Sequence, residues 1–319
     1  GGAGGDFLSF AIAIEELARA DGGIAAIVAI HCGISCSVIY NFGTEEQKKK
    51  YLTPLAKGEK MGAFALTEPG AGSDPGSAVT EAVLDGDEYV INGTKCFITN
   101  GPQAEVVTVF ALTDKSKGTR GMSAFIVPKE AGFKVGKKES KMGIRASQTS
   151  ELIFKDVRVP KENMLGKEGD GFRIAMATLD GGRVGVAAQS VGLAQAALDE
   201  SIKYSKQRVQ FGRPISSNQA IQWMIADMAT DIHAARLMTY YAAMLKDQGK
   251  PFSKEASMAK LFASDVAVRA ARSAVQIHGG YGYMKGYKVE RLMRDAKITE
   301  IYEGTSEIQR IVIANNLLR

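Results

Sequence analysis

The spacing of apolar residues changes twice along this 319-residue chain, and no other feature constrains the fold as strongly. From residue 6 to about residue 57, apolar side chains such as Phe7, Phe10 and Ile14 recur at helical spacing. Short β-type runs follow as far as about Pro160, and the helical period returns after Gly171. We therefore expect a helical domain over residues 1–60, a β domain over 61–162 and a helical bundle over 163–319.

Turn residues divide the middle region into short strands. Asp85-Gly86 and Asn92-Gly93 are dipeptides favoured in two-residue hairpin turns, and both flank strand-like runs. Runs such as VVTVFAL and SAFIVP continue the pattern. The sequence therefore predicts an antiparallel β domain, in the form of a small barrel.

Four alanine-rich helical segments follow the β-type region, and glycine and proline residues separate them. We expect these helices over residues 174–208, 217–246, 254–278 and 306–318, packed as an antiparallel four-helix bundle. The helix starts also carry capping signals. Asp6 is placed to cap the first helix, and Thr44 with Gln47 and Ser306 with Gln309 have the form of capping boxes.

The composition is that of a globular protein, with 45% hydrophobic and 24% charged residues. A net charge of +5 suits a phosphorylated ligand and is weak evidence for nucleic acid. Three cysteines without a C-x-x-C pair and three histidines argue against a disulfide framework and against a metal site, and they favour a reducing compartment. Residues 22–44 carry no charge, but polar residues interrupt the stretch, so we expect a buried helix and no membrane span.

Three stretches have the residue types of a binding site. GAFALTEPGAGSDPGS (residues 62–77) is a strand followed by a loop of small residues, which is either a phosphate or ring cradle or an ordinary surface loop. Its spacing is not that of a dinucleotide-binding fingerprint or a P-loop. Arg208 and Arg213 lie in a loop between helices, where they either bind pyrophosphate or remain solvated. QIHGGYGY (residues 276–283) ends a helix in three glycines, more than a helix C-cap requires.

Glu303 precedes Gly304 just before the last helix. A carboxylate in the first turn of a helix is favoured by the helix dipole, which is the ordinary explanation for such a residue. A carboxylate that burial moves toward neutral pKa is also a suitable general base. The residues alone leave both explanations open.

Four motifs together resemble the acyl-CoA dehydrogenases, the flavoenzymes that desaturate acyl-CoA thioesters. These motifs are LTEPGAGSD, RVQFGRP, QIHGGYGY and RDAKITEIYEGTSEIQR, and the resemblance extends over essentially the whole chain in the family's order. It implies a helical N-terminal portion, a central β domain and a C-terminal bundle, with FAD between the β domain and the bundle. The family's first helices are missing ahead of Gly1, so we expect the N-terminal helical domain to be incomplete.

The resemblance assigns a role to individual residues. Glu303, in the motif YEGT, is implied to be the catalytic base. The residues implied to contact FAD are Phe64, Leu66, Thr67, Gly72, Ser73, Phe97, Ile98, Thr99, Arg208, Gln219, Gln276, Ile277, His278, Gly279, Gly280, Thr305, Ser306 and Glu307. Those implied to bind acyl-CoA are Ser73, Asp180, Gly181, Gly182, Arg183 and Gly304. Arg208, Gln219 and residues 276–280 are implied to reach the FAD of a neighbouring subunit, so a homo-oligomer, a tetramer, is expected.

The segment Leu179-Asp180-Gly181-Gly182-Arg183 narrows the subtype. Isovaleryl-type and long-chain members carry their base in an LDLER-like segment, and Gly182 cannot act as a base. The resemblance is greatest to the short-chain, butyryl-CoA type. It implies the conversion of a short-chain acyl-CoA to the trans-2-enoyl-CoA, or the reverse reduction, with electrons exchanged with an electron-transferring flavoprotein. The expected compartment is the cytoplasm of a bacterium, or the mitochondrial matrix in a eukaryote.

Two alternatives remain open. An acyl-CoA oxidase would share the base and differ in oxygen access, and oxygen consumption without an added acceptor would distinguish it. A nucleic-acid-binding member of the superfamily would need a basic surface rich in aromatic residues. The densest basic run, EEQKKKY, is offset by its own acidic residues. A salt-sensitive DNA shift assay would test this alternative.

Overall fold

Helices occupy most of residues 7–56 in the computed structural model, which describes residues 2–318. Their bounds are α1 (Phe7–Ala20), α2 (Gly22–Val28), a π-helical segment (Ala29–Cys36), α3 (Ser37–Phe42), α4 (Glu45–Gln47), a second π-helical segment (Lys48–Leu52) and α5 (Thr53–Ala56). Two predicted helix starts are confirmed. The Asp6 side chain accepts a hydrogen bond from the Ser9 N–H at 2.7 Å, and Thr44 and Gln47 form a reciprocal capping box before α4.

The uncharged stretch forms one continuous helical run over Gly22–Phe42, which comprises α2, the first π-helical segment and α3. It is the one run in residues 2–318 that is long and apolar enough to cross a membrane. However, 61% of its apolar window is buried inside the protein, as in the core helix of a globular domain. Length and composition are therefore weak evidence for a membrane span here.

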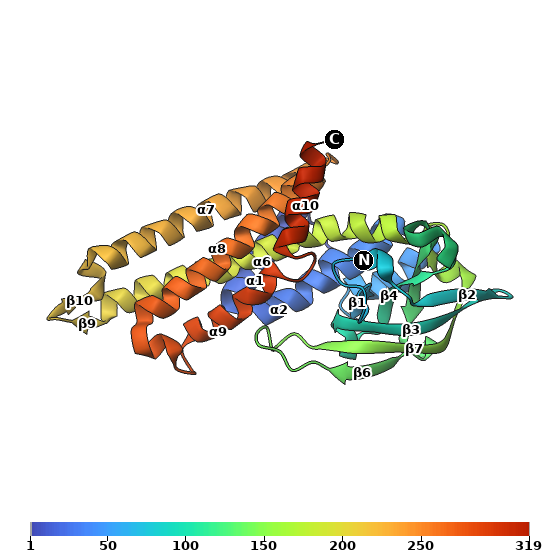
Figure 1. Cartoon of the computed structure of the whole chain (residues 1–319), viewed down its shortest axis with the longest axis horizontal. Helices are drawn as coiled ribbons and strands as arrows, with labels where there is room; N and C mark the ends of the chain where they lie inside the picture. Colours follow the sequence, from blue (N-terminus) through green and yellow to red (C-terminus); the bar gives the residue numbers. More distant parts are fainter. Residues whose placement is uncertain (1, 319) are drawn as a thin grey trace. The chain divides into compact units, whose positions relative to one another are not determined.

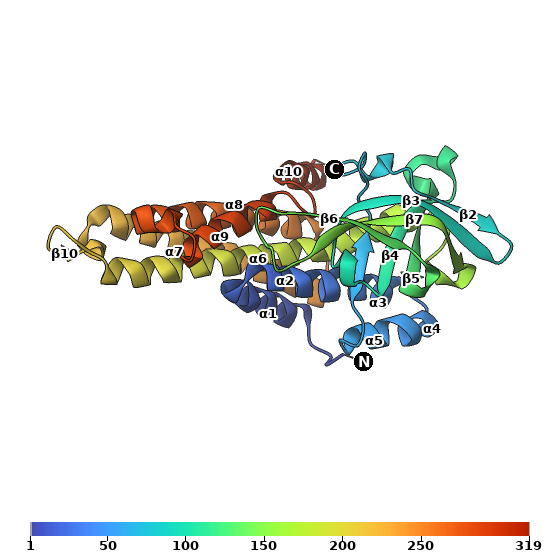
Figure 2. The same cartoon turned by 90° about the horizontal axis from the view of Figure 1, so that it is seen from below.

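A β domain follows, as predicted (Figure 2). Its strands are β1 (Gly62–Ala65), β2 (Glu81–Asp85), β3 (Glu88–Thr99), β4 (Val106–Leu112), β5 (Met122–Pro128), β6 (Lys134–Lys138), β7 (Thr149–Pro160) and β8 (Met164–Leu165). They form one sheet in the order β6-β7-β3-β2-β4-β5-β8, with β1 paired to β4. Neighbouring strands are antiparallel except that β1 and β2 each run parallel to β4.

One of the two predicted hairpin turns is present. Asp85 pairs with Glu88, so Gly86 and Asp87 connect β2 to β3, one position later than the predicted dipeptide. The prediction for Asn92-Gly93 is wrong, because both residues lie inside β3 at a register shift against β7. A side chain at Gly93 would meet the Thr80 hydroxyl at 2.3 Å. The glycine therefore permits a close approach within the sheet and not a chain reversal.

Both faces of β4 are buried. Along β4, Val107, Val109 and Ala111 lie in one core cluster with residues of β2, β3, β5 and β7. Val106 and Phe110 lie in a second cluster, which also contains residues of α3, α5 and the beginning of α6 (Gly171–Gln207). This burial on two faces explains why β4 reads as a continuous apolar run without alternation.

The C-terminal region contains the four predicted helices. They are α6, α7 (Gln219–Asp247), α8 (Ser253–His278) and α10 (Ser306–Leu317), and α7 and α8 lie side by side in Figure 1. A short hairpin of β9 (Val209–Gln210) and β10 (Arg213–Pro214) connects α6 to α7. An additional helix, α9 (Lys288–Ala296), was not among the predicted segments, although it buries Val289, Leu292 and Ala296 at helical spacing.

The chain divides into two compact units. Among the described residues, the β unit comprises residues 2–4, 27–140 and 147–182. The helical unit comprises residues 5–26, 141–146 and 183–318, so the unit boundary falls within α6. The predicted bounds of three domains remain a prediction.

Candidate active site

The turn that carries Glu303 has an uncommon backbone conformation. It connects a 3-10 turn (Lys297–Glu300) to α10, and Glu303 and Gly304 have φ angles of 55° and 92°. A left-handed conformation is readily adopted by glycine but is uncommon for glutamate. The helix is capped by Thr305, whose hydroxyl accepts from the Ile308 N–H at 3.4 Å. The predicted capping box of Ser306 and Gln309 is therefore wrong.

Two buried side chains hold this turn by its carbonyl groups. The Gln309 amide nitrogen donates to the Gly304 carbonyl at 2.8 Å and to the Glu303 carbonyl at 3.3 Å, which explains why it is not free to cap the helix. Lys260, on α8, donates from Nζ to the same Gly304 carbonyl at 2.8 Å. Both side chains are fully buried. Such a backbone conformation persists when surrounding contacts fix it, and these bonds supply the contacts.

The Glu303 carboxyl group is in a poorly solvated environment. Burial raises the pKa of Glu303 to about 7, although the cationic Lys260 and Arg183 oppose the shift. Its Oε2 atom is buried and has no hydrogen-bond partner among the described residues. A carboxyl group with a pKa near neutrality and an unused acceptor is suited to receive a proton from a bound molecule.

Lys260 is a site residue that the sequence reasoning missed. It lies on the alanine face of α8, between Ala256, Ala259 and Ala263, which are all fully buried. Burial lowers the pKa of Lys260 to about 8, while the negative charge of Glu303 opposes that shift. The available signal was a single lysine within a helical stripe of small residues, because a lysine is almost never fully buried without a partner.

Arg183 and Tyr302 complete the surroundings of Glu303. Arg183, on α6, is buried and donates to the Ser257 hydroxyl at 3.4 Å. The Tyr302 hydroxyl bonds to the Gln189 side-chain carbonyl, and burial raises the Tyr302 pKa. Of the residues predicted to bind acyl-CoA, the helical unit thus contains Arg183 and Gly304.

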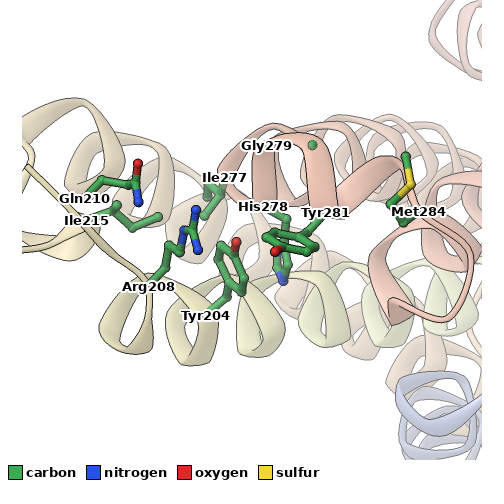
Figure 3. Close-up of a pocket in the computed structure, with 10 residues that line it drawn as sticks. Tyr204, Arg208, Gln210, Ile215, Ile277, His278, Gly279, Tyr281 and Met284 are labelled. Carbon is green, nitrogen blue, oxygen red and sulfur yellow. The ribbon is translucent and has the colours of Figure 1, made fainter.

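A second feature of the helical unit is a cavity of about 530 Å³ at the C-terminal end of α8 (Figure 3). Five predicted FAD contacts line it, namely Arg208, Ile277, His278, Gly279 and Gly280. The sequence reasoning missed its other lining residues, Tyr204, Gln210, Ile215, Tyr281 and Met284. Gln219 and Gln276 were predicted contacts but are exposed and do not line this cavity.

The cavity is polar at one point and aromatic around it. The Tyr204 and His278 rings stack with centroids 4.1 Å apart, and the Arg208 guanidinium lies 5.5 Å from the Tyr281 ring centroid. Burial lowers the pKa of His278, which favours its neutral form. Arg208 is then the one charged group among the described lining residues. A side chain added at Gly279 or Gly280 would meet no atom within 4 Å, so their backbone borders open space.

The other predicted contacts lie in the β unit. Phe64 is half-buried on β1, where its ring packs 4.8 Å from that of Phe110, and Leu66 is buried just after the strand. Phe97 has a φ of 56° and is 65% exposed at a register shift between Lys95 and Ile98. This irregularity turns an aromatic ring out of the sheet while Ile98 stays buried. Such bulges commonly redirect side chains beside active sites.

A buried ion pair anchors the loop after β1. Lys95 donates to the Glu68 carboxylate at 2.7 Å and to the Leu66 carbonyl at 3.0 Å. Glu68 also accepts from the Val79 N–H at 2.7 Å and the Thr80 N–H at 3.1 Å. Burial opposes ionisation of Glu68, but the Lys95 charge and these hydrogen bonds outweigh it and lower the pKa. The pair therefore joins both ends of the loop that carries Gly72 and Ser73.

The remaining predicted residues are placed as follows. Thr67 and Thr99 are half-buried, and Gly72 and Ser73 are exposed on the anchored loop. Asp180, Gly181 and Gly182 lie within α6 in the β unit. Thr305, Ser306 and Glu307 begin α10 in the helical unit. Within residues 2–318, no three His, Cys, Asp or Glu side chains are grouped to hold a metal ion.

Models of one protein family match the chain in order. The N-terminal, middle and C-terminal domains of acyl-CoA dehydrogenase match residues 1–59, 63–157 and 169–318. The chain belongs to the acyl-CoA dehydrogenase family. It is 57% identical to the short-chain specific acyl-CoA dehydrogenase of Clostridium acetobutylicum, over 100% of this chain and 84% of that relative.

Two solved structures share the fold of this acyl-CoA dehydrogenase. Butyryl-CoA dehydrogenase from Megasphaera elsdenii matches with a TM-score of 0.98 and 55% identity, over 99% of this chain and 83% of that chain. A chain in the structure described as the electron transferring flavoprotein of Acidaminococcus fermentans matches with a TM-score of 0.99 and 58% identity. That match covers 100% of this chain and 84% of the other.

Acyl-CoA dehydrogenases are FAD enzymes, and the cavity at the end of α8 fits part of such a cofactor. Arg208 offers a planar set of donors suited to a pyrophosphate, and no other charged group lines the cavity among the described residues. The backbone of Gly279 and Gly280 is open to close approach. The donor set and the open backbone are therefore both compatible with a phosphorylated ligand.

Proposed function

We propose that this enzyme converts a short-chain acyl-CoA to the trans-2-enoyl-CoA, and catalyses the reverse reduction, with Glu303 as the catalytic base. The observation that carries this assignment is the state of the Glu303 carboxyl group. The side chain is half-buried, its pKa is raised to about 7, and its buried Oε2 atom has no hydrogen-bond partner among the described residues. Few other positions in a protein would retain such an unfavourable carboxyl group without a chemical reason.

The chemistry requires removal of a weakly acidic hydrogen from the carbon next to the thioester. Glu303 accepts this α-proton at its carboxylate, and its elevated pKa increases its basicity relative to an exposed glutamate. FAD, when bound, supplies the acceptor for the β-hydrogen, which leaves as hydride. The fixed turn at Glu303 and Gly304 keeps the carboxyl group oriented, and the proposal places the backbone of Gly304 beside the thioester.

The same proposal assigns the remaining ligand contacts. Arg208 and residues 277–280 would hold the FAD of a neighbouring subunit by its phosphorylated part, whereas the exposed Phe97, Thr99 and the anchored loop of the β unit would contact the FAD of their own subunit. Arg183, Ser73 and residues 180–182 would hold the acyl-CoA. Gly182 supports the short-chain subtype, because it lies where other subtypes carry their base and has no side chain to act as one.

The enzyme exchanges electrons with an electron-transferring flavoprotein and works as a homotetramer. We also propose the bacterial cytoplasm as its compartment, which fractionation of the source cells would test. The relative from Clostridium is bacterial, and Cys32, Cys36 and Cys96 are all free thiols. Unpaired cysteines are typical of a reducing compartment.

Replacement of Glu303 by glutamine tests the catalytic assignment. The amide is nearly isosteric and cannot accept the proton, so we expect turnover with butyryl-CoA to fall on the order of 10²–10⁴-fold. Flavin content and acyl-CoA binding should stay near those of the parent. Glu300→Gln is the matched control, because Glu300 lies on the same segment and pairs with Lys297 at 2.5 Å. Parental turnover in Glu303→Gln would exclude Glu303 as the base.

A further inference from the structure

We infer that Lys260 is a positioning residue for the base. From α8 it holds the Glu303–Gly304 turn through the Gly304 carbonyl, and its charge keeps Glu303 in the ionised form that can accept a proton. The inference rests on the proposed role of Glu303 and adds a residue that no sequence motif assigned. Lys260 touches the turn and not a reacting atom, so its effect is exerted through Glu303.

The geometry places two donors on one carbonyl group. Lys260 Nζ and Gln309 Nε2 each lie 2.8 Å from the Gly304 oxygen. Gln309 belongs to α10, which follows the turn, whereas Lys260 belongs to α8, which lies far earlier in the sequence. Because two donors from different helices bind the same oxygen, the peptide group after Gly304 has one orientation. The Glu303 side chain leaves the backbone one residue before this fixed group.

A lysine at this place is unfavourable for folding alone. Lys260 is fully buried on a face of small side chains that includes Ala256, Ala263, Ser257 and Ser264. Burial of an ammonium group is costly unless it is paired and hydrogen-bonded. An apolar residue of similar length would pack there without that penalty. Lys260 is unfavourable for folding and contacts the turn that carries the base, so function explains its presence better than stability does.

The charges around Glu303 determine the sign of the electrostatic effect. Lys260 on α8 and Arg183 on α6 are the cations that lower its pKa against burial, and Tyr302 on the same turn is half-buried. Glu303, Glu300 and Glu307 in turn favour the cationic form of Lys260. Loss of the Lys260 charge would leave burial less opposed. The Glu303 pKa would then rise, and less carboxylate would be present at neutral pH.

Two substitutions separate the hydrogen bond from the charge. Lys260→Met keeps the approximate length of the side chain and removes both the hydrogen bond and the charge. Lys260→Gln keeps a hydrogen-bond donor and removes only the charge. We expect Lys260→Met to lower kcat roughly 10- to 100-fold, the range for loss of one hydrogen bond from a charged donor, with KM nearly unchanged. In both variants the pH midpoint of kcat should move upward. The infrared carboxyl band of Glu303 is identified as the band that Glu303→Gln lacks. In both Lys260 variants, the midpoint of its titration should lie at a higher pH than in the parent.

The matched control is Lys297→Met. Lys297 carries the same charge just before the turn, but it is exposed and pairs with Glu300 at 2.5 Å. Its removal should leave the pH midpoint and the infrared titration unchanged.

The proposed function and this inference fail in different ways. An active Glu303→Gln would refute the role of the base itself. An inactive Glu303→Gln, combined with parental kcat and parental pH midpoint in Lys260→Met, would overturn only the role of Lys260. If Lys260→Met does not fold, the infrared titration of Lys260→Gln decides alone, and an unchanged midpoint there overturns the electrostatic part of the inference.

Discussion

Glu303 combines two unfavourable features, a left-handed backbone and a buried carboxyl group. The first costs on the order of 1–3 kcal/mol for a residue other than glycine. The second makes the residue a source of pH-dependent stability, because burial raises its pKa from 4.5 to about 7. Both features are supported by the contacts of Lys260 and Gln309 with the turn. A position of this kind is expected where activity and stability oppose each other.

The raised pKa predicts the sign of a stability change. Between about pH 4.5 and pH 7 the folded protein binds the Glu303 proton more tightly than the unfolded chain does. The stability that this proton provides is fully present below the unfolded-state pKa, and it is lost as the pH rises through the folded-state value. The free energy of unfolding of the parent, relative to Glu303→Gln, should therefore fall by roughly 2 kcal/mol between about pH 5 and about pH 7.

Denaturant unfolding of both proteins at about pH 5 and about pH 7 measures the difference. Lys260 is protonated at both values, so its titration contributes little. If the free energies of unfolding of the parent and of Glu303→Gln change equally with pH, the Glu303 carboxyl group is well solvated and its pKa is not raised.

The sequence indicates a role for some side chains of the site and not for others. Glu303 is a candidate from its neighbours in the chain, because it precedes a glycine and a helix start, but the resemblance to a family was needed to assign it as the base. Lys260 was not identified, because its partner Gly304 is distant in sequence. The contact depends on the packing of α8 against α10, which apolar spacing does not specify. The capping prediction at Ser306 failed for a local reason, because Thr305 is the N-cap and the Gln309 amide binds the carbonyl groups of the turn.

The long helices were predicted more accurately than the strands. The long helices are bounded by glycine and proline and carry continuous alanine stripes, so α6, α7 and α8 begin and end within a few residues of the expected positions. The hairpin turn predicted at Asn92-Gly93 is absent, because Gly93 lies within a strand and allows the backbone to approach Thr80 closely. Tertiary contacts thus replaced the local preference for a turn. The pairing of β1 with the distant β4 likewise has no local signal.

The ion pair of Glu68 and Lys95 makes the loop after β1 dependent on one buried contact. Both side chains are buried, and the carboxylate accepts from the backbone on the far side of the loop. Removal of one partner leaves the other buried without compensation. We expect Lys95→Met to destabilise the protein by roughly 3–5 kcal/mol. The double variant Lys95→Met with Glu68→Leu should recover part of that loss.

Unfolding by urea, followed by circular dichroism, measures both changes. Lys161→Met is the control, because Lys161 pairs with Asp87 at 2.5 Å on the exposed surface of the same unit. An exposed pair contributes roughly 0–1 kcal/mol, so this variant should remain close to the parent. Equal losses for Lys95→Met and Lys161→Met would show that the buried pair is not the anchor of the loop.

The residues assigned to ligands are distributed over both units of the chain. Phe97, Ser73 and Asp180 belong to the β unit, whereas Arg208 and Glu303 belong to the helical unit. Composition, periodicity and turn chemistry were sufficient to predict the succession of helical, β and helical regions. They contain no information on which residues of separate units serve one ligand. That grouping came from the resemblance to a family, and it stays a prediction for the individual contacts.

Arg208 provides a test that links the cofactor to assembly. It is the one charged group among the described residues of the cavity at the end of α8, and the proposed function places it on the FAD of a neighbouring subunit. Arg208→Ala removes a charge-assisted contact worth roughly 1.5–3 kcal/mol, which corresponds to a loss of FAD affinity of roughly 10- to 150-fold. Because the cofactor would bind only the assembled protein, weaker binding should also loosen the tetramer.

Purified Arg208→Ala should contain less than one flavin per chain by absorbance, and analytical ultracentrifugation should show smaller species that added FAD converts back to the tetramer. Arg213→Ala is the matched control. Arg213 lies in the same connection between α6 and α7, donates to Asn218 at 3.1 Å and does not line the cavity. It should keep full flavin content and the parental size. If Arg208→Ala keeps one flavin per chain and the parental oligomer size, Arg208 is a solvated loop cation and does not belong to the FAD site.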